Sequence, residues 1–309
     1  MIRIITKLFT ATVIFTAVLH VAPLFAVPVT WISSTGSDGN PHPCTAAQPC
    51  ATLDGALGGL DNGGQINCLN SPGFNEFVGL TGISATIDCA GVWDNSAPAT
   101  LTLSGDQTVR IRNLTFSGLP GGISAIKVRG SGTTLIIENC VFENFSGAAL
   151  DIEPTGALNL VITNSTIQHN ASGILIKPIM GASVTATFNG VTIADNTGGG
   201  MKTDTTNGAV SVDISNSTIN NNTGNGLNAV SGAGGTNMLN IRNSVIARNG
   251  TAGVQANGAN AAALIDMTLL DSNASGALTT INGGRLLTYG NNHVVGSAGS
   301  GFTGTAPSQ

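Results

Sequence analysis

Charged residues are scarce in this 309-residue sequence, since Asp, Glu, Lys and Arg together make up only 9% of it, against about 25% in an average soluble domain. Aromatic residues make up only 4%. The net charge of −5 argues against a nucleic-acid-binding protein, which should carry a basic patch. Few charges combined with 42 glycines are typical of short buried strands joined by tight turns.

Beyond the N-terminus the sequence lacks long apolar runs. Arg3 and Lys7 precede the one such run, Leu8 to Leu19, and the small residue Ala26 follows it. This order is typical of a secretory signal peptide cleaved after Ala26. A membrane anchor is the alternative, but the run is shorter than the ~20 residues that a membrane span needs. We therefore expect a signal peptide at 1–26 and a secreted or periplasmic chain without a membrane span.

Cysteine is also rare, with five residues: Cys44, Cys50, Cys68, Cys89 and Cys140. An exported chain meets an oxidising environment, which favours disulfides. Cys44 and Cys50 bracket a short loop, and we expect them to pair. The odd count leaves one thiol over, and we expect Cys140 to be free. No CxxC pair occurs and only His42 lies near these positions, so the sequence predicts neither a metal site nor a cofactor.

What the sequence does have is a repeat of the pattern Ile-x-Asn-x-x-Ile-x-x-Asn. Its first asparagine column recurs every 24 to 27 residues, and a second column of asparagines follows six residues later. The first column consists of Asn113, Asn139, Asn164, Gly190, Asn216, Asn243 and Met267, and the second of Asn170, Asn196, Asn222, Asn249 and Asn273. The register extends back to Cys68 and Cys89, which makes nine units.

A unit this short, rich in β-branched residues, Gly and Asn, excludes helical arrays. It predicts a coil that winds once per repeat and pairs its strands in parallel with its neighbours. Asparagine tolerates the left-handed backbone of a sharp bend and satisfies backbone groups there. Stacked amides also bond to each other, so we interpret Asn113, Asn139, Asn164, Asn216 and Asn243 as a structural ladder. The same stacking brings Cys68 and Cys89 within disulfide range, with or without a bond.

The asparagine columns and the entry segment "ATLDGALGGLDNGGQINCLNSPGF" resemble the pectin lyase-like superfamily. This resemblance implies an all-β fold: a single-stranded right-handed parallel β-helix of about nine coils with a short N-terminal capping helix. The expected boundaries are an entry loop and cap at 27–63, the β-helix at 64–295 and a flexible tail at 296–309. The superfamily includes lyases, hydrolases, esterases, adhesins and binding proteins, so the fold leaves the function open.

One sheet of this β-helix is predicted to carry a concentration of charge on its outer face, where enzymes of the superfamily place their chemistry. Its residues are Lys127, Arg129, Asp151, Glu153, Lys177, Lys202 and Asp204. As an enzyme site, Asp151 and Glu153 stand roughly 6.5–7 Å apart on one strand, near the spacing of an inverting acid and base. Lys177 is then a base or a carboxylate anchor, and Lys127, Arg129, Lys202 and Asp204 bind the ligand.

The alternative is a ladder of cross-strand ion pairs, because the charges along this face alternate in sign from coil to coil. Polygalacturonase and calcium-dependent pectate lyase motifs are missing, and Trp93 is the best candidate for an exposed sugar platform. We favour a secreted, non-catalytic β-helix with an envelope role or an extracellular polysaccharide as its partner. A polysaccharide lyase or glycoside hydrolase is the second hypothesis. The sequence leaves the oligomeric state open.

Overall fold

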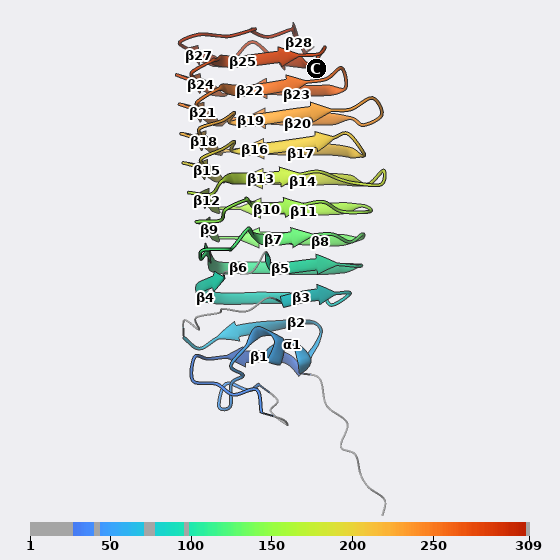
Figure 1. Ribbon diagram of the computed structural model, residues 1–309, viewed down its shortest axis with the longest axis vertical. Helices are drawn as coiled ribbons and strands as arrows, with labels where there is room; N and C mark the ends of the chain where they lie inside the picture. The colour runs from blue at the N-terminus through green and yellow to red at the C-terminus, as the bar shows by residue number, and fades with distance from the viewer. Residues whose placement is uncertain (1–26, 40–43, 71–77, 96–98, 307–309) are drawn as a thin grey trace, which may run out of the picture.

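The protein is described by a computed structural model that covers residues 27–39, 44–70, 78–95 and 99–306. The expected signal peptide at 1–26 and the last residues, 307–309, lie outside the described residues. The described chain is a stack of β-coils with almost no helix, as the sequence predicts (Figure 1). Every strand of a coil pairs in parallel with the equivalent strand of the coils above and below.

One sheet has nine strands, one from each coil, so about eight full turns separate its first strand from its last. Its strands are β3 (Val78–Thr81), β5 (Ala99–Ser104), β7 (Ser124–Val128), β10 (Ala148–Ile152), β13 (Ser172–Ile176), β16 (Met201–Thr205), β19 (Leu227–Ser231), β22 (Ala252–Asn257) and β25 (Gly276–Ile281). We call it the nine-stranded sheet.

The other sheet has nineteen strands and bends sharply along its length. Its longer wall contains β1 (Val27–Ile32), β2 (Leu60–Cys68), β4 (Ala85–Asn95), β6 (Gln107–Gly118), β8 (Thr133–Glu138), β11 (Leu158–Thr163), β14 (Ser183–Asn189), β17 (Ala209–Ser215), β20 (Asn237–Arg242), β23 (Ala261–Asp266), β26 (Arg285–Thr288) and β28 (Gly304–Thr305). Its shorter wall contains β9 (Val141–Glu143), β12 (Thr166–Gln168), β15 (Thr192–Ala194), β18 (Thr218–Asn220), β21 (Val245–Ala247), β24 (Leu269–Asp271) and β27 (His293–Val295).

The bend between the two walls lies at the first asparagine column. Asn113, Asn139, Asn164, Asn216 and Asn243 have φ values of 48° to 62°, in the left-handed region. Gly190 and Met267 occupy the same bend with φ of 67° and 44°. Asparagine and glycine adopt this conformation at low cost, which explains why they recur here once per coil.

The core runs along the axis of the stack as columns of equivalent apolar residues. Ile162, for example, pairs with Ile137 below it and Phe188 above it, and all three side chains are buried. Burying one such side chain contributes about 1.5–3 kcal/mol. The alternation of buried and outward residues along each long strand fixes the register, because a slip of one residue would turn this column outward.

Trp93 belongs to this core, which corrects its interpretation as an exposed sugar platform. β4 extends to Asn95, and a register shift between Asp88 and Gly91 places Trp93 opposite Phe116. Trp93 is fully buried and stacks on Phe116, which stacks on Phe142, with ring centroids 5.4 and 4.9 Å apart. The shift adds one residue to β4 relative to β6, so Trp93 follows Cys89 by four residues where Phe116 follows Asn113 by three, and the repeat pattern did not reveal this extra residue.

The N-terminal end of the stack is covered by the helix α1 (Leu53–Gly58). Thr52 caps it by accepting a hydrogen bond from the Gly55 amide at 3.0 Å, and Leu53 and Ala56 pack into the core. The stack itself begins earlier than the expected residue 64, because β1 already pairs in parallel with β2. Disulfides join Cys44 to Cys50 and Cys68 to Cys89, and Cys140 is a buried free thiol.

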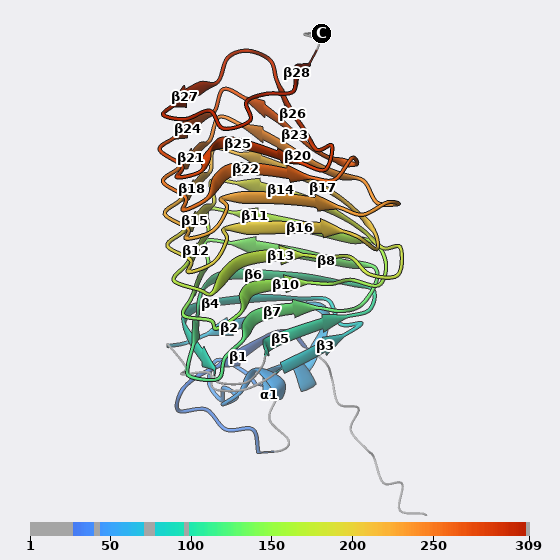
Figure 2. The same ribbon diagram turned by 45° about the horizontal axis from the view of Figure 1, so that its top comes forward.

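The C-terminal end differs from the flexible tail that the sequence predicted for 296–309. Residues 296–306 follow the last coil, where β28 pairs with β26 (Figure 2). The amide of Ala277 donates to the Ser297 carbonyl at 2.8 Å, and the amide of Thr303 donates to the Leu286 carbonyl at 2.7 Å. The exposed backbone edge of the last coil supplies these partners, so this glycine-rich segment closes the end of the stack.

No helix of the described residues is long and apolar enough to cross a membrane.

Candidate functional site

The predicted charged face lies on four consecutive strands of the nine-stranded sheet. Lys127 is on β7, Asp151 on β10, and Lys202 and Asp204 on β16, while Arg129, Glu153 and Lys177 directly follow β7, β10 and β13. The register pairs Lys127 with Asp151 and places Leu175 between Asp151 and Lys202. The structure therefore brings these seven residues onto one outward strip, which we call the charged strip.

The acidic groups of the charged strip are held by its basic groups. Asp151 Oδ2 contacts Lys127 Nζ at 3.2 Å and Arg129 Nη2 at 3.1 Å. Glu153 Oε2 accepts a hydrogen bond from Arg129 Nη1. The Asp151 side chain is 13% exposed, and its other oxygen, Oδ1, is buried without a hydrogen-bond partner among the described residues. Arg129 thus bridges the two carboxylates that an enzyme would need as its acid and base.

The carboxylate of the charged strip on β16 is also held by an ion pair. Lys202 Nζ contacts Asp204 Oδ2 at 3.1 Å, and the hydroxyl and amide of Thr206 both donate to Asp204 Oδ1. Burial acts to raise the pKa of Asp204, but the hydrogen bonds from Thr206 and Lys202 outweigh it and lower that pKa below 3.8. Lys177 forms no ion pair with any described residue.

The longer wall of the nineteen-stranded sheet carries a second ion-paired group, which the sequence analysis missed. Arg110 Nη1 contacts Glu138 Oε1 at 2.9 Å, and Arg112 Nε lies 3.5 Å from Asp88 Oδ2. The repeat register could have found it, because Arg112, Glu138 and Asp88 occupy one column on β6, β8 and β4. Both groups therefore follow the same rule of opposite charges on neighbouring strands.

The two asparagine columns have different surroundings. In the first column the asparagine side chains are exposed. Among the described residues, side chains of this column bond to each other in two places, from Asn139 to Asn113 and from Asn243 to Asn216. The second column is buried, and each of its first four amides donates to the next member's Oδ1 at 2.8–3.1 Å. The continuous asparagine ladder is therefore the second column: Asn170, Asn196, Asn222, Asn249 and Asn273.

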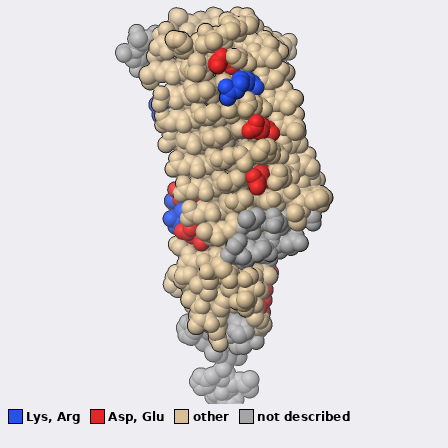
Figure 3. Space-filling view, turned by 90° about the vertical axis from the view of Figure 1, so that its left-hand side faces the viewer, with Lys and Arg blue, Asp and Glu red and all other residues tan. Residues whose placement is uncertain are grey.

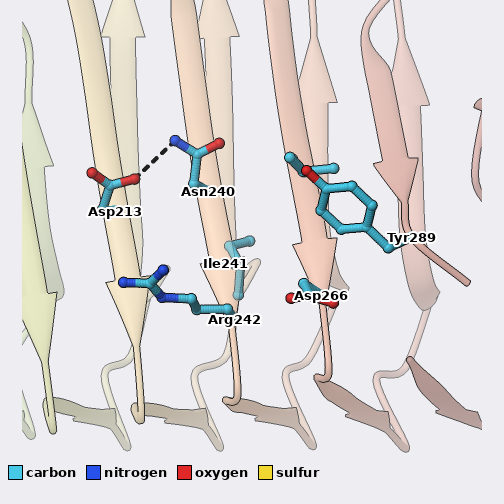
Figure 4. A pocket seen from close by; sticks show the side chains of 7 residues that line it. Asp213, Asn240, Ile241, Arg242, Asp266 and Tyr289 are labelled. Atoms are coloured by element: carbon cyan, nitrogen blue, oxygen red, sulfur yellow. Dashed lines mark hydrogen bonds between the residues drawn. The ribbon is translucent and has the colours of Figure 1, made fainter. Parts of the chain in front are cut away.

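Two concave regions of the described surface lie on the longer wall, and the charged strip lines neither of them. The first is an open groove of about 440 Å³ that crosses β8, β11 and β14, lined by neutral side chains that include Thr134, Asn159 and Thr185. The second, of about 320 Å³, crosses β17, β20 and β23. We call this second region the Tyr289 recess, after the exposed aromatic ring at its edge. It is lined by Asp213, Asn240, Ile241, Arg242, Leu264, Asp266 and Tyr289 (Figure 4).

Other parts of the described surface offer little chemistry. The face of the shorter wall is almost uncharged, with a few isolated charges and one mixed cluster at its edge (Figure 3). His169 lies there in an exposed left-handed turn with φ of 56°. Within the described ranges, no three His, Cys, Asp or Glu side chains are grouped so as to hold a metal ion.

Comparison with known proteins agrees with this architecture. A family model described as "Right handed beta helix region" matches residues 99–269. The solved structure of pectate lyase Pel9A has a TM-score of 0.61 over 90% of this chain and 78% of that chain, with 14% identity. The GH136 lacto-N-biosidase from Eubacterium ramulus has a TM-score of 0.45 over 91% of this chain and 67% of that chain, with 11% identity. No curated protein matches the sequence. At these identities the likeness concerns the fold, and it agrees with the resemblance to pectin lyase-like proteins.

Proposed function

Since the chain belongs to the right-handed β-helix family, we propose that it is a secreted, non-catalytic β-helix that binds an extracellular polysaccharide in a structural role at the cell envelope. The observation that carries this proposal is the pairing within the charged strip. A glycosidase needs one carboxyl group to deliver a proton and another to hold a water or attack the sugar. Here Arg129 bonds Asp151 Oδ2 and Glu153 Oε2, so one oxygen of each carboxylate is already engaged.

A role in binding a polymer is supported by the shape and chemistry of the longer wall. Its strands stack at about 4.8 Å per coil, which gives a long surface with equivalent side chains at regular steps. Both concave regions described above cross this wall. The pectate lyase with the same fold acts on a polysaccharide, and an extended chain is the ligand that a regular, elongated surface fits best.

Export is part of the same proposal. Two disulfides, Cys44–Cys50 and Cys68–Cys89, fit an oxidising compartment better than the cytosol. We expect the exported product to begin at Val27, after removal of residues 1–26. Sequencing the N-terminus of protein recovered from the medium or periplasm tests this, and retention of the intact chain in the cytoplasm would contradict it.

The test of the function is to incubate the purified protein with a panel of soluble acidic and neutral polysaccharides. Binding is measured by affinity electrophoresis, and cleavage separately by the release of reducing ends and unsaturated products. We expect at least one polymer to be bound and none to be cleaved. Cleavage that disappears in Asp151→Asn or Glu153→Gln would establish the second hypothesis, a lyase or hydrolase. If the protein binds none of the polymers, the proposed function is wrong.

A further inference from the structure

The charges of the Tyr289 recess form no ion pairs with each other, in contrast to the ion-paired group on β4, β6 and β8 of the same wall. Arg242 stands in the same column as Arg112 and Glu138, which form ion pairs near the N-terminal end of the stack. Its neighbour across the strands is Asp266, yet no carboxylate of the described residues lies within ion-pair distance of Arg242. Figure 4 shows the Arg242 side chain extending toward β17, away from Asp266.

The recess presents hydrogen-bonding groups of both kinds at two adjacent steps of the stack. Asn240 Nδ2 donates to Asp213 Oδ1 at 2.8 Å, which fixes both side chains and leaves Asp213 Oδ2 and Asn240 Oδ1 as acceptors. Arg242 supplies donors. These three side chains come from two neighbouring strands, β17 and β20, so their spacing is set by the sheet and not by loops.

An apolar floor and an aromatic ring complete the recess. Leu264 on β23 and Ile241 on β20 line it. Tyr289 follows β26, and its ring lies beside β23 next to the polar groups (Figure 4). Tyr289 is 46% exposed, in a sequence in which only 4% of the residues are aromatic. An exposed aromatic ring beside fixed polar groups offers one apolar face and one hydrogen-bonding edge.

The charges decide which ligand fits. The recess is lined by two carboxylates, Asp213 and Asp266, and one guanidinium, Arg242, so its net charge is negative and it disfavours an acidic sugar or another anion. The two carboxylates are on strands two steps apart, about 10 Å along the stack, which is too far to share a divalent cation with ligand distances of about 2.3–2.6 Å. Two consecutive uncharged pyranose units match both features, since the apolar C–H face of one lies on Tyr289 beside β23 while the hydroxyls of the next bond to Asp213, Asn240 and Arg242 on β17 and β20.

We propose that the Tyr289 recess binds two consecutive neutral sugar units of an extracellular polysaccharide. This inference rests on the proposed polymer-binding function and names the part of the surface and the class of polymer. The site is separate from the charged strip, because it lies on the longer wall of the nineteen-stranded sheet.

The inference is tested by measuring the affinity of the purified protein for neutral polysaccharides, with a β-glucan, a galactomannan and a xylan as probes and polygalacturonate as the acidic counterpart. We expect a neutral polymer to bind, and Tyr289→Ala and Arg242→Gln each to weaken that binding about tenfold. Tyr289→Phe retains the ring and should restore the affinity. Arg248→Gln is the matched control, because Arg248 is an exposed arginine on the bend after β21 that bonds Asn221.

The outcomes separate this inference from the function on which it rests. If a polymer binds and neither Tyr289→Ala nor Arg242→Gln weakens it, the recess is not the site, although the proposed function stands. If polygalacturonate binds in preference to every neutral polymer, the neutral class is wrong. If Tyr289→Phe binds as weakly as Tyr289→Ala while both remain folded by circular dichroism, the ring is not a platform. Absence of binding to every probe overturns the inference and the function together.

Discussion

At the residue scale, the two asparagine columns show how one residue type serves two purposes. In the first column the backbone conformation selects asparagine, because the bend requires a positive φ. In the second column the side chain selects it. Asn196, for example, accepts hydrogen bonds from the amide and the Nδ2 of Asn170 and donates to Asn222 Oδ1 and the Ile167 carbonyl. The Asn196 side chain thus links its own coil to the coils on both sides.

This difference predicts unequal costs of substitution. Asn196→Ala removes four buried hydrogen bonds and takes away the acceptor of the Asn170 backbone amide, and we expect it to lower the free energy of unfolding by about 3 kcal/mol or more. The matched variant Asn216→Gly removes only exposed bonds and keeps the left-handed bend, as Gly190 does in the same column. We expect it to cost less than about 1 kcal/mol. Urea unfolding measures both, and equal costs would contradict the distinction between the columns.

Asp204 makes stability depend on pH in one direction. Because its pKa in the folded protein lies below the ordinary value of 3.8, its charged form stabilises the fold above that pH, and this contribution is lost as the pH falls through the folded pKa. We expect Asp204→Asn to lower the Tm at neutral pH, with the difference from the wild type shrinking below pH 3.8. A difference that stays constant over this range would show that the Asp204 charge does not matter.

At the element scale, the ends of the stack depend on added covalent and backbone links. Each coil contacts only its neighbours, so the first and last coils have half the contacts of an inner coil. The Cys68–Cys89 disulfide joins β2 to β4 across a separation of 21 residues, and β28 covers the opposite end. Both devices reduce fraying at a sheet edge that would otherwise be open.

The disulfide prediction is therefore local. We expect Cys68→Ser combined with Cys89→Ser to lower the free energy of unfolding by about 3 kcal/mol, as for a loop of this length. Hydrogen exchange should become faster in β2 and β4 and stay unchanged in β20.

The number of thiols gives an independent check, since denatured protein without reductant should expose one thiol per chain, that of Cys140. Burial raises the pKa of Cys140 to about 11, so this thiol should be unreactive in the folded protein. More than one thiol after denaturation would contradict the pairing.

At the scale of the whole molecule, the repeat was sufficient to predict the β-helix, because a single register places every inward isoleucine and every bend. It was not sufficient where the period is broken. The extra residue in β4 places Trp93 in the core opposite Phe116, and the ordered end of the chain at β28 depends on an edge that exists only in the folded stack. Asp151, Glu153 and Arg129 were brought together as predicted from the strand spacing, whereas Tyr289 lies outside the repeat and joins the recess only through the last coil.

The central claim is that the charged strip stabilises the register of the sheet and performs no chemistry. Glu153→Gln tests it most directly, with polysaccharide binding, polysaccharide cleavage and thermal stability measured on the same sample. Since Glu153 is a partly exposed partner in an ion pair, its neutralisation should lower the free energy of unfolding by well under about 1 kcal/mol. Polysaccharide binding should stay unchanged, and neither the wild type nor the variant should cleave a polysaccharide. Loss of binding or of a cleavage activity in Glu153→Gln, at an unchanged Tm, would contradict the claim and identify the charged strip as an active site.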